Sequence, residues 1–237
     1  MRSEVHNIDC LEFMRQMPDK SFQLGIADPP YGINAPKMGM GSGYSNGHYS
    51  STKRLNGGGG KLKNRVLNTS DCEWDAKPPT KDFFDELFRV CVNVIIWGSN
   101  YFELPPTRCV ICWDKMQPWE NFSQIELAWT SFDKPAKLYR QINGGANVER
   151  KIHPTQKPVE LYGYLLRMFA KEGDLIFDPM MGSQSSRIAA YKMGLDFCGC
   201  ELSKEYFDKG CQRFQQACKG ETKLENGQKI CQMTLFD

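Results

Sequence analysis

Residues 22–31 read FQLGIADPPY, an apolar run that ends in an acid, two prolines and a tyrosine. Such a run predicts a buried strand, and parallel strands present ligand-binding residues at their carboxyl ends. Proline fixes φ and biases the residue before it toward extended backbone, so the carbonyl groups of Asp28 and Pro29 are held at a set angle. The stretch therefore predicts a strand of an α/β fold that ends in a rigid turn.

The turn formed by Asp28, Pro29, Pro30 and Tyr31 carries groups that suit a planar amine. The NH2 group of a nucleobase offers two N–H donors to the carbonyl groups, and Tyr31 offers an aromatic face on which an extruded base can stack. A strand followed by a purely structural proline turn is the alternative interpretation of these four residues. The rest of the sequence has to decide between the two.

Candidate strands and helices alternate along the chain. Short apolar runs predict strands at 4–8, 22–27, 92–97, 109–113, 125–130, 175–177 and 197–200. Helical patterns fall at 9–17, 81–90, 158–170, 183–193 and 204–218. The alternation predicts an α/β fold of three layers, in which helices cover both faces of a twisted, mostly parallel, seven-stranded sheet.

The length and the charge distribution predict one domain with a basic insertion. The chain has 237 residues, 41% of them hydrophobic, so we expect a single domain over 1–218 followed by a flexible tail, 219–237. The net charge is only +2, but no acid falls between Pro29 and Ser70. The segment 33–70 is rich in Gly, Ser and Asn, which indicates an inserted cationic loop that becomes ordered on binding a partner.

The cysteine pattern favours a reducing compartment. The ten cysteines accompany neither a secretory leader nor an apolar run long enough to span a membrane. These features predict free thiols, a cytoplasmic location and no membrane span. Cys109 and Cys112 have the spacing of half a zinc site, but no second pair follows at a matching distance, so we expect no metal site.

Three acids, Asp28, Asp178 and Glu201, each follow a predicted strand. Because the carboxyl ends of parallel strands meet at one edge of a sheet, they predict a shared ligand-binding crevice. Each acid taken alone can instead stabilise the N-terminus of the helix that follows it.

Residues 178–183 read DPMMGS and connect a predicted strand to a predicted helix. This is a nucleoside-binding layout, because Gly182 lets a ligand approach the backbone and Glu201, at the end of the next strand, can accept hydrogen bonds from a ribose diol. A dinucleotide-binding G-x-G-x-x-G motif is absent, since Gln184 stands where its second glycine would fall. The pyrophosphate interpretation is therefore disfavoured.

Three motifs occur in a distinctive order. D-P-P-Y at 28–31 is followed by a variable region, by H-P-T-Q-K-P at 153–158, and by D-P-M-M-G-S at 178–183 with a strand ending in Glu201. Over nearly the whole chain this order resembles the β group of amino-methylating DNA methyltransferases. The resemblance implies a Rossmann-like S-adenosylmethionine-dependent methyltransferase fold with permuted motif order. It also implies methyl transfer to the 6-amino group of a flipped adenine in duplex DNA.

The resemblance assigns roles to the motif residues. It implies that Asp28, Pro29, Pro30 and Tyr31 are catalytic. The implied cofactor-binding residues are Asp9, Asp28, His153, Thr155, Lys157, Asp178, Pro179, Met180, Gly182, Ser183, Gln184, Ser185 and Glu201. Helix capping is an equally good account of Asp9. Segments 97–102 and 126–130 resemble family segments that flank the target pocket.

Two positions depart from the family pattern. Met180 replaces the usual phenylalanine, and Gln184 replaces a glycine. We expect the cofactor loop to follow a somewhat different path and to bind S-adenosylmethionine more weakly or in a differently shaped site.

The choice of acceptor follows from the motifs. The family tends to use D-P-P-Y for adenine and S-P-P-Y for cytosine, so adenine is favoured and the exocyclic amine of cytosine is the alternative. No proline precedes a cysteine, which disfavours methylation at cytosine carbon 5 because that chemistry uses a thiolate nucleophile. An RNA methyltransferase usually has the reverse motif order, and an inactive DNA-binding module would not need acids at three strand ends.

Basic and aromatic residues provide candidate DNA contacts. The expected phosphate-binding residues are Lys53, Arg54, Lys61, Lys63, Arg65, Arg140, Arg150 and Lys151. A solvated loop face is the alternative. Trp119, Phe122 and Tyr31 are candidates for holding the flipped base or filling its gap. The segment 131–152 is the expected target-recognition region, and it is short for reading a whole DNA site.

Residues 232–236 read QMTLF and resemble the pentapeptide by which bacterial proteins dock on the replicative sliding clamp. The contact would use Gln232, Leu235 and Phe236, and a terminal strand is the alternative. The family resemblance further implies a homodimer and a restriction-modification setting in a bacterial host or a phage-infected cell.

Overall fold

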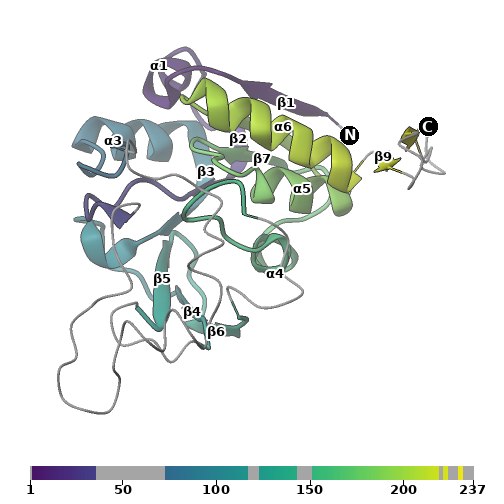
Figure 1. Cartoon of the computed structure of the whole chain (residues 1–237). Helices are drawn as coiled ribbons and strands as arrows, with labels where there is room; N and C mark the ends of the chain where they lie inside the picture. Colours follow the sequence, from purple (N-terminus) through teal and green to yellow (C-terminus); the bar gives the residue numbers. More distant parts are fainter. Residues whose placement is uncertain are drawn as a thin grey trace.

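The computed structural model describes residues 2–35, 73–116, 123–142 and 151–218, together with the backbone of 221–223 and 229–231. Within these residues a single large sheet carries helices on both faces (Figure 1). The predicted three-layer α/β architecture is confirmed.

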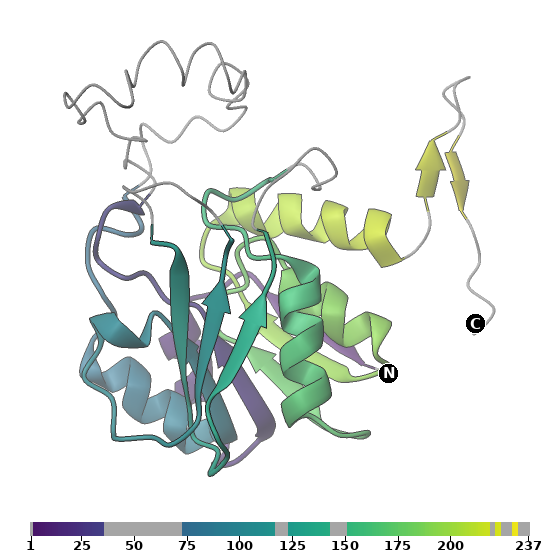
Figure 2. The same cartoon turned by 90° about the horizontal axis from the view of Figure 1, so that it is seen from below.

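The main sheet of the described residues has eight strands in the order β1-β8-β7-β2-β3-β5-β4-β6 (Figure 2). The strands are β1 (Ser3–His6), β2 (Phe22–Ala27), β3 (Cys91–Trp97), β4 (Val110–Asp114), β5 (Ile125–Thr130), β6 (Lys137–Arg140), β7 (Leu175–Asp178) and β8 (Asp196–Cys200). β5 is antiparallel to both of its neighbours, and the other neighbouring pairs are parallel. The carboxyl ends of the parallel strands therefore lie along one edge.

The sheet has one strand more than the seven that the sequence predicted. The additional strand, β6, lies inside the predicted recognition region 131–152 and pairs in parallel with β4. Its sequence, KLYR, has no apolar run, because β6 is an edge strand and its residues alternate between half-buried and exposed positions. A search for apolar runs does not find such a strand.

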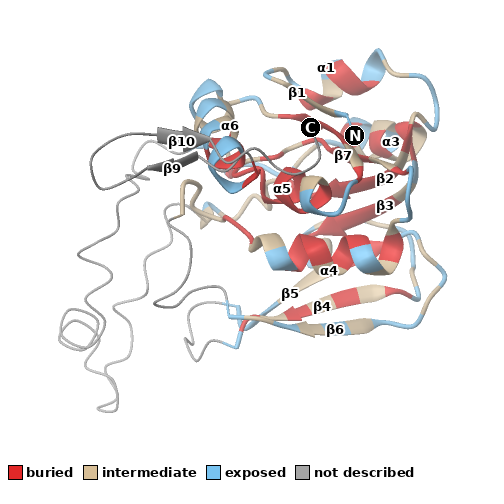
Figure 3. Cartoon of the chain, turned by 90° about the vertical axis from the view of Figure 1, so that its right-hand side faces the viewer, coloured by how far each residue is buried: buried red, intermediate tan, exposed pale blue. Residues whose placement is uncertain are grey.

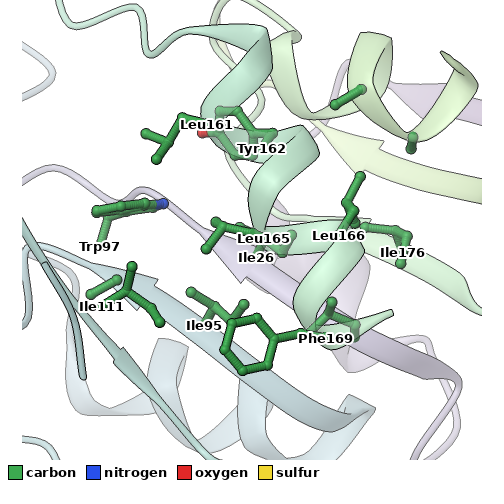
Figure 4. Packing of buried hydrophobic residues seen from close by; sticks show 14 of the residues in the cluster. Ile26, Ile95, Trp97, Ile111, Leu161, Tyr162, Leu165, Leu166, Phe169 and Ile176 are labelled. Carbon is green, nitrogen blue, oxygen red and sulfur yellow. The ribbon is translucent and has the colours of Figure 1, made fainter. Parts of the chain in front are cut away.

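Two hydrophobic cores separate the three layers. Helices α1 (Cys10–Arg15) and α3 (Lys81–Val90) pack on one face of the sheet, and α4 (Val159–Phe169) and α5 (Ser185–Lys192) pack on the other. Strand β3 alternates between the cores, since Ile95 and Trp97 face α4 while Val94 and Ile96 face α3. Figure 3 shows the central strands buried on both faces, and Figure 4 shows the α4 core from close by.

Helix α6 (Lys204–Cys218) forms a third, smaller cluster. Phe214 and Cys218 of α6 pack against Ile188 of α5. The main chain then continues into β9 (Glu221–Lys223) and β10 (Lys229–Cys231), which pair antiparallel. This pairing falls in the tail for which no fixed structure was predicted.

The predicted helices are present with small changes at their ends. The pattern 9–17 becomes α1 with Asp9 as its N-cap, and 158–170 becomes α4 with Pro158 as its N-cap. The short helix η2 (Ser99–Tyr101) follows β3 through Gly98, whose φ is +73°. None of the described helices is long and apolar enough to cross a membrane.

Candidate active site

The three acids at strand ends lie at the same edge of the sheet. β2 and β7 are neighbours with Gly25 opposite Phe177, and β7 and β8 are neighbours with Asp178 opposite Gly199. Asp28 and Glu201 therefore each stand just beyond the end of a strand that flanks β7. We call the turn 28–31 the β2 corner, and the loop 178–183 with Glu201 the β7–β8 corner. Both corners therefore lie at the carboxyl-terminal edge of the parallel strands.

Asp28 belongs to a buried polar cluster at the β2 corner. Lys157 Nζ donates to Asp28 Oδ1 at 2.5 Å and to the Tyr31 hydroxyl at 3.1 Å, and that hydroxyl donates to the same oxygen at 2.8 Å. The Lys157 side chain is only 4% exposed. Burial raises the pKa of Asp28, and the Lys157 ammonium partly opposes this shift. Lys157, implied to bind the cofactor, thus contacts the turn that is implied to be catalytic.

A second ion pair extends this cluster into the sheet. Lys115, just after β4, contacts Oε1 of Glu126 on β5 at 2.9 Å. The other oxygen, Oε2, is buried and forms an ion pair with Lys157 Nζ at 3.1 Å, which is its closest polar contact among the described residues. Burial alone would raise the pKa of Glu126, yet Lys157 and Lys115 together lower it to about 2.

The ring of Tyr31 is held from one side. It stacks on Tyr101 of η2, with ring centroids 5.0 Å apart, and a Cβ built at Gly98 would overlap it. Gly98 is therefore required for this close approach as well as for its own positive φ. Because Tyr101 occupies one face, a base that stacks on Tyr31 must use the other face.

The two acids of the β7–β8 corner are held by neutral donors. Asp178 accepts hydrogen bonds from the backbone N–H of Met180 and from the hydroxyl of Ser186. Glu201 accepts one bond per oxygen, from the backbone N–H groups of Gly182 and Ser203, each at 2.8 Å. Burial raises the pKa of both carboxyls, that of Asp178 to about 7.

Gln184 occupies the position where the family has glycine and keeps the backbone conformation of a glycine. Its φ is +59°, and its fully buried side chain points to α6 and accepts a bond from Arg187 at 2.9 Å. Gly210 of α6 makes room for it, because a Cβ there would lie 2.7 Å from the Gln184 side chain. The structure thus accommodates the Gln184 side chain, and the changed path of the cofactor loop stays a prediction.

The motif 153–158 connects the two corners. Ser185 donates from its hydroxyl to the Lys157 carbonyl at 2.7 Å, and Arg213 of α6 donates to that hydroxyl and to the Ser183 carbonyl. The ring of His153 lies about 3.5 Å from where a Gly182 Cβ would be. The segment that holds Asp28 through its lysine thus also contacts the loop that follows β7.

His153 is enclosed by aromatic rings. Trp74 and Tyr206 lie 5.0 and 4.4 Å from it, between ring centroids, and Thr155 donates to its Nδ1 from the backbone. Burial lowers the pKa of His153 to about 3, and Lys157 adds to the effect, so the imidazole is neutral at neutral pH. Thr155 therefore contacts His153, and its implied part in binding the cofactor stays a prediction.

The remaining sequence-predicted residues have different surroundings. Asp9 caps α1 by accepting from the N–H groups of Leu11 and Glu12, which agrees with the alternative account of this residue. Met180 packs in the core on the α1 and α3 face, and Pro179 is buried.

The expected DNA-binding residues are only partly described. Arg140 is exposed and lies 3.3 Å from Asp114. Lys151 is half-buried, and burial lowers its pKa while the nearby charge of Glu126 opposes the shift; its expected contact with DNA stays a prediction. Residues Lys53, Arg54, Lys61, Lys63, Arg65, Trp119, Phe122 and Arg150 lie outside the described residues.

Sequence reasoning did not single out three residues of this site. Lys115, Tyr162 and Arg213 come from elements whose patterns read as structural. Glu126 was included only as part of the segment 126–130, which resembles a family segment that flanks the target pocket. Tyr162 is buried on α4, and burial and the charges of Asp28 and Asp178 raise its pKa. The sequence does place a lysine just after β4 and a glutamate near the start of β5. Charged residues at strand ends are usually solvated, so this pair alone does not indicate a buried site.

A comparison with known families decides the assignment. A family model described as a DNA methylase, N6_N4_Mtase, matches residues 74–212, which is more than half of the chain. The chain belongs to this DNA methylase family. The match includes the β7–β8 corner, Glu126 and Lys157, and the turn 28–31 lies outside the matched residues.

Individual relatives are more distant. Type II methyltransferase M.HpaI of Haemophilus parainfluenzae is 29% identical over 119 residues, which is 44% of this chain and 38% of the relative. Type II methyltransferase M2.DpnII of Streptococcus pneumoniae is 26% identical over 174 residues, 73% of this chain and 59% of the relative. The alignments thus span about two fifths and three fifths of these proteins.

Solved structures share the fold. The cytosine-N4-specific PvuII DNA methyltransferase has a TM-score of 0.57 at 13% identity and covers 96% of this chain and 94% of its own. The M1.HpyAVI complex with S-adenosylmethionine has a TM-score of 0.52 at 17% identity and covers 89% and 98%. At these identities the similarity establishes the fold of this family member.

Proposed function

We propose that this protein transfers the methyl group of S-adenosylmethionine to the exocyclic amine of a base flipped out of duplex DNA, with adenine as the preferred base. The observation that carries the proposal is the position of Asp28 and Asp178 at the ends of adjacent parallel strands, with one motif contacting both corners. Membership of the DNA methylase family supports the same chemistry.

The β2 corner can prepare an amine for attack. The lone pair of an exocyclic amine is delocalised into the ring, and hydrogen bonds from its two N–H groups to the Asp28 carboxylate and the Pro29 carbonyl localise it on nitrogen. Lys157 and the Tyr31 hydroxyl both bind Oδ1, which leaves Oδ2 of Asp28 as the acceptor for the base. Positioning supplies much of the acceleration in such a transfer.

The residues of the β7–β8 corner fit the cofactor. Each oxygen of Glu201 accepts one backbone N–H and keeps a lone pair for a ribose hydroxyl. The Gln184 side chain points to α6 and does not fill the loop. When bound, S-adenosylmethionine supplies an electrophilic methyl group on a sulfonium sulfur. The roles of Asp178, Gly182, Ser183 and Glu201 in holding it are part of this proposal.

Methyl transfer tests the proposal directly. The purified protein is incubated with tritiated S-adenosylmethionine and, in parallel, with unmethylated genomic DNA, RNA and protein, and labelled DNA is digested to nucleosides. We expect label in DNA as N6-methyladenine. Label only in RNA or protein would refute the DNA substrate. N4-methylcytosine as the sole product would establish the alternative acceptor, which the shared fold of the PvuII enzyme keeps under consideration.

Contacts with the DNA backbone can be tested by salt dependence. We propose that Lys61, Lys63 and Arg65 contact phosphates. Replacing the three by alanine is expected to weaken DNA binding and to reduce the slope of log K against log salt by roughly 0.9 per lost contact. An unchanged slope would exclude this segment from the DNA interface.

Two further partners are proposed from the sequence. Deleting residues 232–237, which removes Gln232, Leu235 and Phe236, is expected to abolish capture by a bacterial sliding clamp, and undiminished capture would refute that contact. A homodimer is expected from sedimentation at micromolar concentration, and a monomer would contradict it. We also propose a cytoplasmic setting in a bacterial host or phage-infected cell.

A further inference from the structure

One ammonium group is shared by two carboxylates at the β2 corner. Lys157 Nζ lies 2.5 Å from Asp28 Oδ1 and 3.1 Å from Glu126 Oε2. The Lys157 side chain is almost completely buried, and the two carboxylates outweigh burial and raise its pKa. Because Lys157 stays charged, the carboxylates of Asp28 and Glu126 both pair with the same ammonium group.

Glu126 is itself balanced by a second lysine. Lys115 holds Oε1 at 2.9 Å and lies over the ring of Trp113, so its position is fixed by packing as well as by charge. The four charges alternate in sign and sum to zero, in the order Asp28, Lys157, Glu126 and Lys115. Each charge affects the pKa of the group beside it. A buried carboxylate oxygen without a donor is costly unless a nearby charge compensates it, so the arrangement points to a role.

We propose that Glu126 is a positioning residue for methyl transfer, because by competing with Asp28 for the Lys157 ammonium it leaves the Asp28 carboxylate a stronger acceptor for the target amine. This inference rests on the proposed function. In the transfer, the amine lone pair forms the new N–C bond while the C–S bond breaks and its electron pair stays on sulfur. The nitrogen then loses one N–H proton to Asp28, which passes it to water on product release.

Several charged groups face Asp28 and have to be considered together. Tyr31 comes from the turn itself, Lys157 from the segment before α4, and Glu126 from β5. Tyr162 of α4 and Asp178 at the end of β7 also interact with its charge. Lys115 and Lys151 reach Asp28 through Glu126. Neither Glu126 nor Lys115 contacts Asp28 directly. Substituting either residue therefore alters the contacts of Asp28 only through Lys157, which contacts both Asp28 and Glu126.

The decisive test compares two variants with opposite expected effects. The rate of single-turnover methyl transfer to unmethylated genomic DNA is measured against pH at saturating S-adenosylmethionine. Glu126→Gln gives Asp28 a larger share of Lys157, so the acid limb of the profile moves down by about one pH unit, and the plateau rate falls roughly three- to tenfold. Lys115→Met leaves Glu126 less compensated, so the acid limb moves up.

Three further variants separate this role from a structural one. Glu126→Asp keeps the charge and is expected to restore the wild-type midpoint. Lys115→Met has no further effect on the midpoint when Gln is already at position 126, because Lys115 acts through Glu126. Asp85→Asn removes an acid from the exposed pair with Lys81 on α3 and is the matched control, with no shift.

A second readout does not depend on activity. Carbon NMR of protein labelled at aspartate carboxyls, with Asp28 assigned by Asp28→Asn, is expected to show the same opposite shifts of the Asp28 midpoint without DNA or cofactor. Midpoints that stay fixed, or that move the same way in Glu126→Gln and Lys115→Met, would overturn the inference. A wild-type protein that transfers no methyl group would instead refute the proposed function, and the NMR titration would still decide the inference.

Discussion

The two corners of the sheet edge hold their acids in different ways. At the β2 corner the carboxylates of Asp28 and Glu126 are balanced by lysines. At the β7–β8 corner, within the described residues, Asp178 and Glu201 receive only backbone N–H and hydroxyl donors and form no ion pair with a lysine or arginine. A neutral corner suits an uncharged base, and a corner with uncompensated negative charge suits a cofactor that carries net positive charge.

The largest expected effect comes from removing the acid at the neutral corner. Asp28→Asn keeps the shape of the side chain but loses the carboxylate, so methyl transfer is expected to fall by about a hundredfold or more. Binding of S-adenosylmethionine, measured by calorimetry, is expected to change little, because the cofactor contacts that we propose lie at the other corner, although the resemblance also implies a cofactor contact for Asp28. Full activity of this variant would show that Asp28 is not catalytic. Loss of cofactor binding would show that the β2 corner also contributes to the cofactor site.

The converse change tests the uncompensated corner. Glu201→Gln removes a charged acceptor from the expected ribose site, and losing hydrogen bonds to a charged group costs about 1.5–3 kcal/mol, or roughly ten- to a hundredfold in affinity. Calorimetry measures the loss. The rate at saturating cofactor is expected to stay near the wild-type value, and Asp85→Asn, in the exposed pair with Lys81, again serves as control. Unaltered affinity would exclude Glu201 from the cofactor site.

The pH dependence of cofactor affinity sharpens the contrast further. Burial raises the pKa of Asp178 to about 7, so a bound cation favours the ionised form and affinity is expected to rise with pH through neutrality, by up to tenfold per unit below the midpoint. Asp178→Asn is expected to flatten this dependence.

The same carboxyl predicts an effect on stability. The native state binds this proton more tightly than the unfolded chain does, so its contribution is present at low pH and is lost as pH rises toward 7. Thermal unfolding at pH 5 and pH 8 checks the sign. A wild-type protein and an Asp178→Asn variant with parallel pH profiles would contradict both expectations.

The smallest effect concerns the packing behind the β7–β8 corner. Gly210→Ala places a methyl group 2.7 Å from the Gln184 side chain, and such overpacking costs about 1–3 kcal/mol. The double variant Gln184→Gly with Gly210→Ala is expected to recover part of this loss, because the side chain that clashes is gone. Thermal unfolding of the wild-type protein, the two single variants and the double variant measures the change in stability. Additive losses would show that the two positions are not coupled.

The sequence predicted the fold well because its central strands are buried on both faces. Runs such as 22–27 and 92–97 are long and apolar, and acids mark where such strands end, so the shared edge could be inferred before the structure. β6 was missed because an edge strand needs no apolar run. The hydrophobic pattern of a sequence reports which residues are buried, so it identifies buried strands and helices but not exposed edge strands.

The site was predicted less completely than the fold. Motif residues such as Asp28 and Glu201 were found because their types and spacing carry chemistry. Lys115 was not found, and Glu126 was noted only within the segment 126–130, because a charge near a strand end ordinarily indicates a solvated position. Only the pairing of β4 with β5 brings these two side chains together near Lys157. Contacts between elements far apart in sequence cannot be read from local pattern.

The pairing of β1 with β8 constrains how the protein is made. The strands β2 to β6 arise from one continuous half of the chain, whereas the backbone of Arg2 bonds to Asp196, 194 residues away. Loop closure over that distance is slow, and β1 can pair only after β8 has been synthesised. The edge of the sheet beside the strand that precedes Glu201 is thus completed later than the contacts between β4 and β5 that place Glu126 beside Lys115.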